Sequence, residues 1–565
     1  MLRRNKRQLK LMVLFFVPET RVRTSSLSGI KALLSTMIMN PLLRIFLKSK
    51  SLFLVSLTVR VGDIMESIEG QHLFQSIKSP ASKVGGTQQK SLLQVFKKMV
   101  PYKYYIDVII EQTSFALVEQ CLPPLTEGEF LRYIGIWLLM ATCSGWSQND
   151  FWSSKDYHAR TNACPYNFKD FMSKKRFSMI TRELRLTNKA PPTYRGRFWE
   201  VREIIKSWND HMADIFVPAW ALCLDKSMSI WHSMYTCQGW VFCPRKPHPF
   251  GNEYHSMCCG ESGVMLNVEM VEGKDRLREL GQCEFEDRGG KTVGLLLQML
   301  KKYFSTGRYV ILDSGFCILK GIVELKKEGI YAGALIKKRR YWPSLVPGEE
   351  IDSHFESKNV GETDVISGSL SGVEYFIWGM KEPDYVMKIM GTGGALVTDG
   401  CKQAKRTWTD GNNSHSANFS YTKPFHWHFH YHHVVDDHNN LQDSLPSIED
   451  TWRTDRWPAR VFAFLLALSE VNAYLVMRHF VWDDEETPTY LNFRRELAWE
   501  LIDNPMLEGK KEAATQNVRR LQNTRKLITA PKHANRWDGR GWKKEAKFPY
   551  QQFTCKSADS AKCPK

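Results

Sequence analysis

The chain has 565 residues, and its hydrophobic content of 43% is enough to bury several cores in more than one domain. Its 18 Trp and 30 Phe exclude general disorder. Its 13 cysteines include no CxxC or CxxxC pair, so we expect reduced thiols in an intracellular protein and no disulfide framework.

The net charge of +18 is concentrated at the two ends of the chain. Residues 1–60 hold twelve Lys or Arg against one Glu, and residues 510–565 hold fifteen against four acidic residues, so the body is slightly acidic. Basic ends favour sequence-independent contacts with nucleic acid, and a solubilising or targeting tail is the alternative for either end. Residues 1–60 are also typical of an organelle transit peptide, or they are an extension that is not native. No apolar stretch reaches the roughly 18 residues that span a bilayer, so we expect no membrane segment.

The first predicted elements in chain order are helices, and strands alternate with helices after Trp220. Apolar residues recur with a helical period over 128–141, 168–186 and 198–216. The predicted elements that follow are a strand over 264–271, a helix over 291–304, a strand ending at Asp313, a helix through Leu319, Ile322 and Leu325, and a strand over 331–336. This order predicts an α/β fold in which helices cover a sheet.

The second half of the chain predicts a β-rich segment and then a long helix. Residues 341–424 indicate short strands and loops, with the clearest hairpin over 376–388, and 453–480 indicates a helix with Trp457 and Pro458 in its first turn. The histidine-rich run 426–433 alternates with aromatic residues and predicts a packed strand. Zinc or copper binding there is the less favoured alternative, because four ligands along one strand extend over about 20 Å.

Three short apolar runs each end on an aspartate, namely Asp225, Asp313 and Asp436. A short apolar run bounded by turn residues is typical of a strand buried on both faces, and a carboxylate at its end must be paired, solvated or bound to a cation. Three such carboxylates at one sheet edge predict divalent metal, because Mg²⁺ prefers carboxylate oxygens. The alternative for each aspartate is a structural role as the cap of the following helix or turn.

The sequence around these aspartates resembles the piggyBac family of transposases from about Pro101 to the C-terminus. The stretch 224–228 is similar to the family motif (I/L)DE(S/A)M, and 244–251 is similar to (M/P)xKPxKWG. The stretch 311–316 resembles (L/T)xxDNFYTS, with Ser314 where Asn is usual, and 435–440 resembles GGVDxxDQ. Further similarity lies in 150–153, 172–177, 455–458 and 472–474.

The resemblance implies an RNase H-like catalytic core with a β-rich insertion, flanked by a mainly helical dimerisation and DNA-binding domain. It also implies a nuclear, dimeric transposase that excises DNA through hairpin ends and inserts it at TTAA targets. Asp225, Asp313 and Asp436 would hold two Mg²⁺ ions, for which Mn²⁺ could substitute, with Asp437 and Asn439 as further possible ligands. The alternative function is a domesticated, non-mobile DNA-binding protein that keeps the fold, and the alternative location is an organelle.

The predicted domain boundaries follow the same resemblance. We expect a basic extension and linker (1–100), a helical dimerisation and DNA-binding region (101–216), the first part of the catalytic core (217–340), the insertion (341–424), the third-acid segment of the core (425–446), a helical region that rejoins the first (447–530), and a basic tail (531–565).

Predicted contacts with DNA lie near the acids and in the tail. We expect double-stranded DNA to contact Arg245, Lys246, Trp457, Lys543, Lys544 and Lys547. The tail also holds Cys555 and Cys563, which resemble the beginning of the cysteine-rich zinc module that the family often carries. A structural zinc site needs four ligands, so this incomplete module predicts no bound Zn²⁺.

Overall fold

The computed structural model describes the central part of the chain. The described residues are 91–153, 164–190, 196, 198–244, 246–273, 284–336, 343–394, 398, 401–444, 446–483, 485 and 487–507, with the backbones of strands β1 (Val55–Ser56) and β2 (Ala81–Ser82). The chain divides into two compact units, Met1–Val55 and Ser56–Lys565, and the helices and strands from β2 onward belong to the second unit.

The first described region is helical, as its apolar period predicts. Its helices are α6 (Leu92–Met99), α7 (Tyr102–Tyr104), a π-helical segment (Tyr105–Ile110), α8 (Glu111–Val118), α9 (Glu127–Met140), α10 (Lys174–Glu183) and α11 (Trp199–Ile215), with a 3₁₀ turn at Asp150–Trp152. Helix α9 begins where the Thr126 hydroxyl accepts a hydrogen bond from the Glu129 amide, and Glu127 and Glu129 complement the positive end of its dipole. Its apolar side chains are almost all buried.

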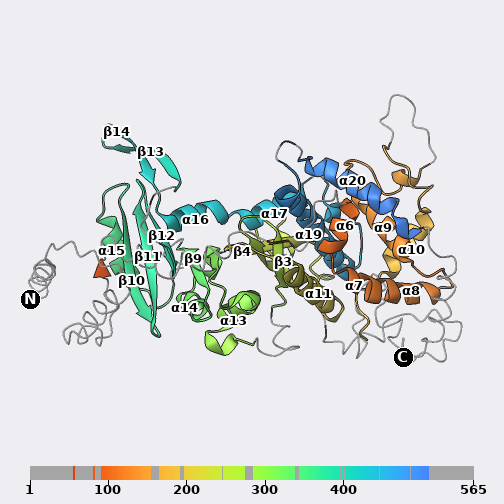
Figure 1. Ribbon diagram of the computed structural model, residues 1–565, viewed down its shortest axis with the longest axis horizontal. Helices are drawn as coiled ribbons and strands as arrows, with labels where there is room; N and C mark the ends of the chain where they lie inside the picture. Colours follow the sequence, from red (N-terminus) through yellow and green to blue (C-terminus); the bar gives the residue numbers. More distant parts are fainter. Residues whose placement is uncertain are drawn as a thin grey trace, which may run out of the picture. The chain divides into compact units, whose positions relative to one another are not determined.

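A large mixed sheet forms the centre of the fold (Figure 1). Its strands are β4 (Ala221–Ile230), β5 (Trp240–Phe242), β6 (Phe250–Cys259), β7 (Met265–Met270), β8 (Tyr309–Leu312), β9 (Tyr331–Leu335), β10 (Thr363–Leu370), β11 (Val373–Lys381) and β12 (Val386–Gly391). From β10 the order is β10-β11-β12-β9-β8-β4-β6-β5, and β7 also pairs with β6. Strands β4, β8 and β9 are parallel, and the other pairs are antiparallel. The short strand β3 (Phe216–Val217) pairs with β2 outside this sheet.

Helices connect and cover the parallel strands. Helices α13 (Lys291–Leu300) and α14 (Leu319–Lys327) pack on each other, and α14 contacts β9. 3₁₀ turns lie at Glu286–Arg288, Lys301–Tyr303 and Ser314–Phe316. The predicted order of strand, helix and strand around Asp313 is therefore confirmed by β8, α14 and β9.

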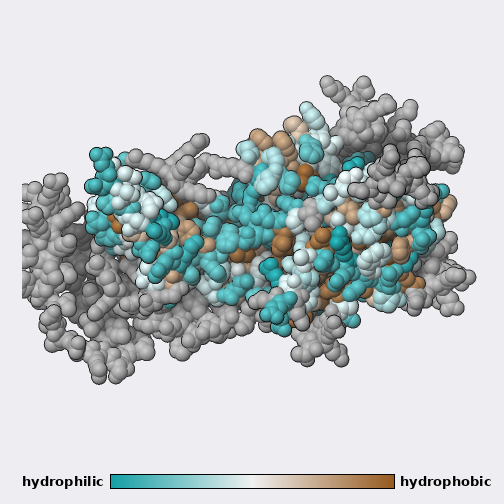
Figure 2. All heavy atoms as spheres, turned by 90° about the horizontal axis from the view of Figure 1, so that it is seen from above, coloured by the Kyte–Doolittle hydropathy of each residue, from teal (hydrophilic) through white to brown (hydrophobic). Residues whose placement is uncertain are grey.

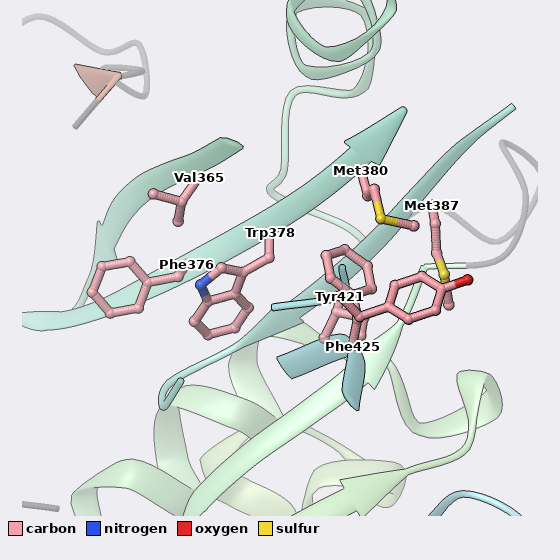
Figure 3. Packing of buried hydrophobic residues seen from close by; sticks show 8 residues of the cluster. Val365, Phe376, Trp378, Met380, Met387, Tyr421 and Phe425 are labelled. Carbon is pink, nitrogen blue, oxygen red and sulfur yellow. The ribbon is translucent and has the colours of Figure 1, made fainter. Parts of the chain in front are cut away.

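The β-rich segment continues the same sheet instead of forming a separate one. Strand β12 pairs antiparallel with β9, which joins the β10–β12 meander to the parallel strands. Figure 3 shows the apolar cluster of this region, in which Phe376 lies beside Trp378 and Tyr421 lies beside Phe425. Helix α15 (Gly348–Glu356) was not predicted; it buries Ile351 and Phe355 against this region. A separate ribbon of β13 (Gln403–Asp410) and β14 (Asn413–Ser420) is largely exposed.

The histidine-rich run forms helix α16 (Lys423–Tyr431), so the predicted strand is wrong. Pro424 starts the helix, and the buried side chains Phe425, His428 and Tyr431 are spaced by three residues, which fits a helix face and not a strand face. The following segment, expected as a third apolar strand before Asp436, is also a helix, α17 (Val434–Asp443). Two apolar residues are too few to fix a strand against the local helical preference.

The last described elements are helices that pack on the first ones. They are α18 (Ile448–Thr451), α19 (Trp457–Phe480), α20 (Tyr490–Ile502) and a 3₁₀ turn (Pro505–Leu507). Helix α20 packs on α9, and the Trp137 ring of α9 stacks on Trp452 with centroids 4.4 Å apart. Segments more than 300 residues apart in sequence therefore share one helical core.

Among the described residues, α19 alone is long and apolar enough to cross a membrane, a stretch that the sequence analysis did not recognise. Nearly all of it is buried inside the protein, as in the core helix of a globular fold. Hydrophilic residues cover much of the described surface in view in Figure 2, and apolar residues form small separate patches. The architecture is the predicted one, a mixed α/β fold with a β-rich insertion and flanking helices.

Candidate active site

Asp225 and Asp313 lie side by side, Asp225 in the middle of β4 and Asp313 directly after the end of β8. Strands β4 and β8 are parallel, with Leu224 opposite Leu312, and the Asp313 amide donates to the Leu224 carbonyl oxygen over 3.1 Å. Paired strands lie about 4.8 Å apart, and the next residue of each strand is the aspartate. The sheet register thus brings together two carboxylates that are 88 residues apart in sequence.

The carboxylate of Asp313 also caps the turn that follows its strand. Its Oδ2 accepts from the Gly315 amide and its Oδ1 accepts from the Ser314 hydroxyl, each over 3.2 Å. Ser314, which departs from the family motif, therefore supports the orientation of the aspartate. The capping alternative and the proposed ligand role are compatible here, because a carboxylate offers more than two acceptor positions.

Asp436 reaches this region from the first turn of α17. Two hydrogen bonds fix the helix to β4, since the Ser227 hydroxyl donates to Asn439 Oδ1 over 2.8 Å and Asn439 Nδ2 donates to the Lys226 carbonyl oxygen over 3.4 Å. On the other side of α17, His438 Nε2 contacts Asn472 Oδ1 over 3.2 Å. Asp436 itself keeps a side chain that is 52% exposed.

Asn472 is a positioning residue whose role the sequence analysis missed. Its amide pairs with both backbone groups of Met265 on β7 and with His438 on α17, so one buried side chain of α19 fixes a strand and the helix that carries Asp436. A single amide in the middle of a long apolar helix was the available signal, because a buried polar group needs partners. Burial lowers the pKa of His438 to about 4, so this ring stays neutral at physiological pH.

The three carboxylates influence one another electrostatically. Burial and then the negative charge of Asp313 raise the pKa of Asp225 to about 6, and Asp436 adds to the increase. Lys246 and the Lys226 amide act in the opposite direction. Like charges at short range favour the neutral acid, whereas a bound cation would favour the ionised form.

Lys246 lies at the tip of the β5–β6 hairpin, and its Nζ contacts Asp436 Oδ1 over 2.9 Å. Burial alone would lower the pKa of Lys246, but the hydrogen bond to Asp436 and the charges of Asp225 and Asp313 raise it overall. The lysine is therefore positively charged and attracts the three carboxylates Asp225, Asp313 and Asp436, which we name the acid cluster.

The two further predicted ligands lie outside this cluster. Asp437 is 60% exposed and pairs with His433 Nε2 over 3.3 Å. The amide of Asn439 is already hydrogen-bonded to β4, as described above. Asp437 and Asn439 thus take part in local contacts of α17.

The donor atoms of the acid cluster suit a hard divalent cation, since all are carboxylate oxygens. Within the part of the chain that the structure describes, no group of three or more His, Cys, Asp or Glu side chains is close enough to hold a metal ion. The acids are therefore electrostatic neighbours without forming a closed set of ligands.

Trp457 was predicted to contact DNA, and its burial contradicts that prediction. Only 4% of the residue is exposed, its Nε1 donates to Asn252 Oδ1 over 2.6 Å, and the Phe198 ring packs edge-on against it. Trp457 is a core residue at the beginning of α19. The predicted DNA contacts at Arg245, Lys543, Lys544 and Lys547 and the cysteines Cys555 and Cys563 lie outside the described residues.

The histidines of α16 line a cavity instead of a strand face. The cavity has a volume of about 400 Å³ and is lined by Lys402, His426, Phe429, His430 and His433. His426 Nδ1 accepts from the Lys402 amide over 2.9 Å, and burial lowers the pKa of His426. Among the described residues, these histidines form no group of three or more side chains that is close enough to hold a metal ion.

Comparisons with known proteins agree with this architecture. A family model described as Transposase IS4 matches residues 93–474, more than half of the chain, so the chain belongs to this family of transposases. A solved structure of a piggyBac transposase synaptic complex with hairpin DNA is similar to the chain with a TM-score of 0.57. The two are 15% identical, and the similarity covers 79% of this chain and 88% of that one, which confirms a piggyBac-type fold. No curated protein matches the chain.

Proposed function

We propose that the chain is a piggyBac-like transposase that cleaves and joins DNA at the acid cluster. The observation that supports the proposal is that β4, β8 and α17 bring Asp225, Asp313 and Asp436, which are up to 211 residues apart in sequence, near enough for Asp313 and Asp436 to raise the pKa of Asp225. Membership of a transposase family and the fold of a protein solved with hairpin DNA support DNA as the substrate.

Two divalent cations, Mg²⁺ or Mn²⁺, would supply charge stabilisation and an activated water or 3′-hydroxyl for in-line attack on a phosphodiester. Asp225, Asp313 and Asp436 are the residues that would hold them. Their carboxylates are positioned from the backbone by β4, β8 and α17, and Asn439 and Asn472 fix α17. Lys246 orients Asp436, and its positive charge favours the approach of a phosphate group.

The finer features of the proposal follow from the family resemblance. They are cut-and-paste transfer between transposon ends and TTAA targets, action as a homodimer, and location in the nucleus. The second candidate, a non-mobile DNA-binding protein with the same fold, is separated from the first by the experiment below.

The test is nicking of supercoiled plasmid by the full chain with Mg²⁺ or Mn²⁺, combined with a gel-shift measurement of DNA binding. Asp225→Asn, Asp313→Asn and Asp436→Asn should each abolish nicking and leave binding within about twofold, because affinity for DNA depends mainly on basic groups. Asp437→Asn is the matched control, since it removes a carboxylate one residue away that pairs with His433, and it should nick like the wild type. Metal-dependent nicking by Asp313→Asn would refute the site, and a wild type that binds DNA without cutting it would favour the second candidate.

A further inference from the structure

Three aromatic rings form an exposed stack on the hairpin that carries Lys246. Trp240 and Phe242 alternate along β5, and Phe242 lies directly opposite Phe250 on β6, so the three side chains share one face. The Phe242 and Phe250 rings are 5.0 Å apart with planes 17° from parallel, and Trp240 and Phe250 are 5.9 Å apart at 20°. We name Trp240, Phe242 and Phe250 the aromatic platform.

The platform is exposed although its members are large apolar residues. Phe242 is 55% exposed and Phe250 is 37% exposed, whereas most aromatic residues in the described part of the chain are buried. The platform is also fixed in place, because Trp240 Nε1 donates to the Trp231 carbonyl oxygen over 2.9 Å. A rigid and exposed apolar surface is typical of a binding site.

The hairpin connects the platform to the acid cluster. The Cys243 amide donates to the Pro249 carbonyl oxygen over 2.7 Å, which closes the loop between Phe242 and Phe250. Lys246 in this loop contacts Asp436, and His248 Nε2 lies 3.8 Å from Asp443 on the same helix. Lys246 is four positions from Phe242 and four from Phe250 in sequence, which limits each Cα–Cα separation to about 14 Å.

The chemistry of this surface selects its occupant. Flat aromatic faces stack on nucleobases, and they do so for every base because each has a π-face. A base is available for stacking only where it is unpaired, and enzymes that act within a duplex often take bases out of the stack. Lys246 in the loop between Phe242 and Phe250 places an ammonium group near the platform, which suits the phosphates of such a strand.

We propose that the aromatic platform binds unpaired nucleobases next to the phosphodiester that is cut or joined. This inference rests on the proposed function, because it assumes that DNA enters the acid cluster. It adds a requirement for a locally single-stranded segment and assigns Phe242 as the stacking residue.

The test measures binding of the full chain to oligonucleotide duplexes in Ca²⁺, so that the readout is independent of cleavage. One duplex is blunt, and the other has a four-nucleotide single-stranded end that contains 2-aminopurine, whose fluorescence falls on stacking. Phe242→Ala should abolish the fluorescence decrease and weaken binding of the tailed duplex by about 5- to 150-fold. Binding of the blunt duplex should change by less than about twofold.

Two variants control this measurement. Phe242→Trp should restore the fluorescence decrease, because it restores an aromatic face at the same position. Tyr385→Ala removes a ring that is 56% exposed just before β12, so it should bind and quench like the wild type.

The outcomes separate the platform from the proposed function. A wild type that nicks plasmid, together with Phe242→Ala that quenches normally, would overturn the platform and leave the function. Quenching that depends on Phe242 in a protein that does not nick would support the platform and overturn the function. A change in oligomeric state of Phe242→Ala, with unchanged quenching, would show that a second copy of the chain covers the surface and would overturn the proposal.

Discussion

Two groups of charged side chains in this protein, one fully buried and one partly exposed, differ in how positive and negative charges are paired. Between α19 and α20, Arg494 and Glu470 are both fully buried and form two hydrogen bonds, of 2.7 and 3.0 Å. The remaining donors of Arg494 contact the carbonyl oxygens of Ala141 and Pro446 and the Tyr490 hydroxyl. At the acid cluster, Asp313 and Asp436 repel Asp225, and Lys246 attracts all three carboxylates.

The difference separates a structural charge group from a candidate functional one. Arg494 and Glu470 are neutral as a pair and have their hydrogen-bonding groups satisfied, so the site has no capacity for a further ligand. At the acid cluster, Asp313 and Asp436 raise the pKa of Asp225, so a bound cation would relieve the repulsion between these carboxylates. Burial and charge alone do not identify a functional site, whereas repulsion between neighbouring carboxylates is a reason to expect a bound cation.

Breaking the buried ion pair between Arg494 and Glu470 should have the largest effect on the free energy of unfolding. Arg494→Met leaves Glu470 buried without a partner, so the free energy of unfolding should fall by about 3–5 kcal/mol. Denaturant unfolding followed by circular dichroism measures the loss. Lys206→Met is the control, because Lys206 forms an exposed pair with Asp210, and its effect should stay below about 1 kcal/mol. A loss below about 1 kcal/mol for Arg494→Met would show that the pair contributes little.

Another buried carboxyl group, that of Glu449, allows a test of the effect of burial where the opposite charge nearby is not sufficient to offset it. Its Oε2 accepts from the Ser229 hydroxyl over 2.5 Å and its Oε1 accepts from Gln442 Nε2 over 3.2 Å. Burial raises the pKa of Glu449 from 4.5 to about 7, against the attraction of Arg460. Because the folded-state pKa is the higher one, the stabilisation is complete below pH 4.5 and is lost as the pH rises through about 7.

The expected slope is about 1.4 kcal/mol of unfolding free energy per pH unit between these two values. Glu449→Gln removes the titration, so the difference in stability between wild type and variant should change across this window, in favour of the variant at high pH. Unfolding titrations at half-unit steps from pH 4.5 to 8 measure this difference, in which the other titrating groups cancel. A difference that is independent of pH would contradict the assignment of a protonated Glu449.

Neutralising one member of the acid cluster should have the smallest effect on the free energy of unfolding. In contrast to the loss expected for Arg494→Met, the free energy of unfolding should stay the same or rise. Asp225→Asn removes a repulsion from Asp313 and Asp436, so without divalent cations the variant should be as stable as the wild type or up to about 1 kcal/mol more stable at pH 7.5. Thermal unfolding in the presence of a chelator measures the change. A marked destabilisation would mean that Asp225 acts as a structural acceptor, as Glu470 does.

Many of the helices and strands can be predicted from the sequence where the apolar pattern is local. The apolar run before Asp313 predicts β8, and the run before Asp225 predicts only the first half of β4, which continues past Asp225 to Ile230. The helical period predicts α9, α11 and α14. The family motifs predict that the acids converge, because motifs carry information on spatial neighbours that periodicity does not.

The rest depends on contacts between distant segments. Trp457 lies at the beginning of a helix, and the local sequence is the same whether its side chain is buried or exposed. Only its contacts with Phe198 and Asn252 in the fold show that it is buried. The alternation of His and aromatic residues in α16 imitates a strand, and burial of every third residue against the sheet decides for the helix. The contact between Lys246 and Asp436 joins residues 190 positions apart, and no local rule predicts it.

The central claim is that the acid cluster binds divalent cations, and Mn²⁺ binding measured by electron paramagnetic resonance tests it most directly. The wild-type chain should bind Mn²⁺ with an affinity that Mg²⁺ competes for, and Asp225→Asn combined with Asp313→Asn should abolish this binding. Asp437→Asn should bind as the wild type does. Equal Mn²⁺ binding by the wild type and the double variant would contradict the claim and would place any metal site elsewhere in the chain.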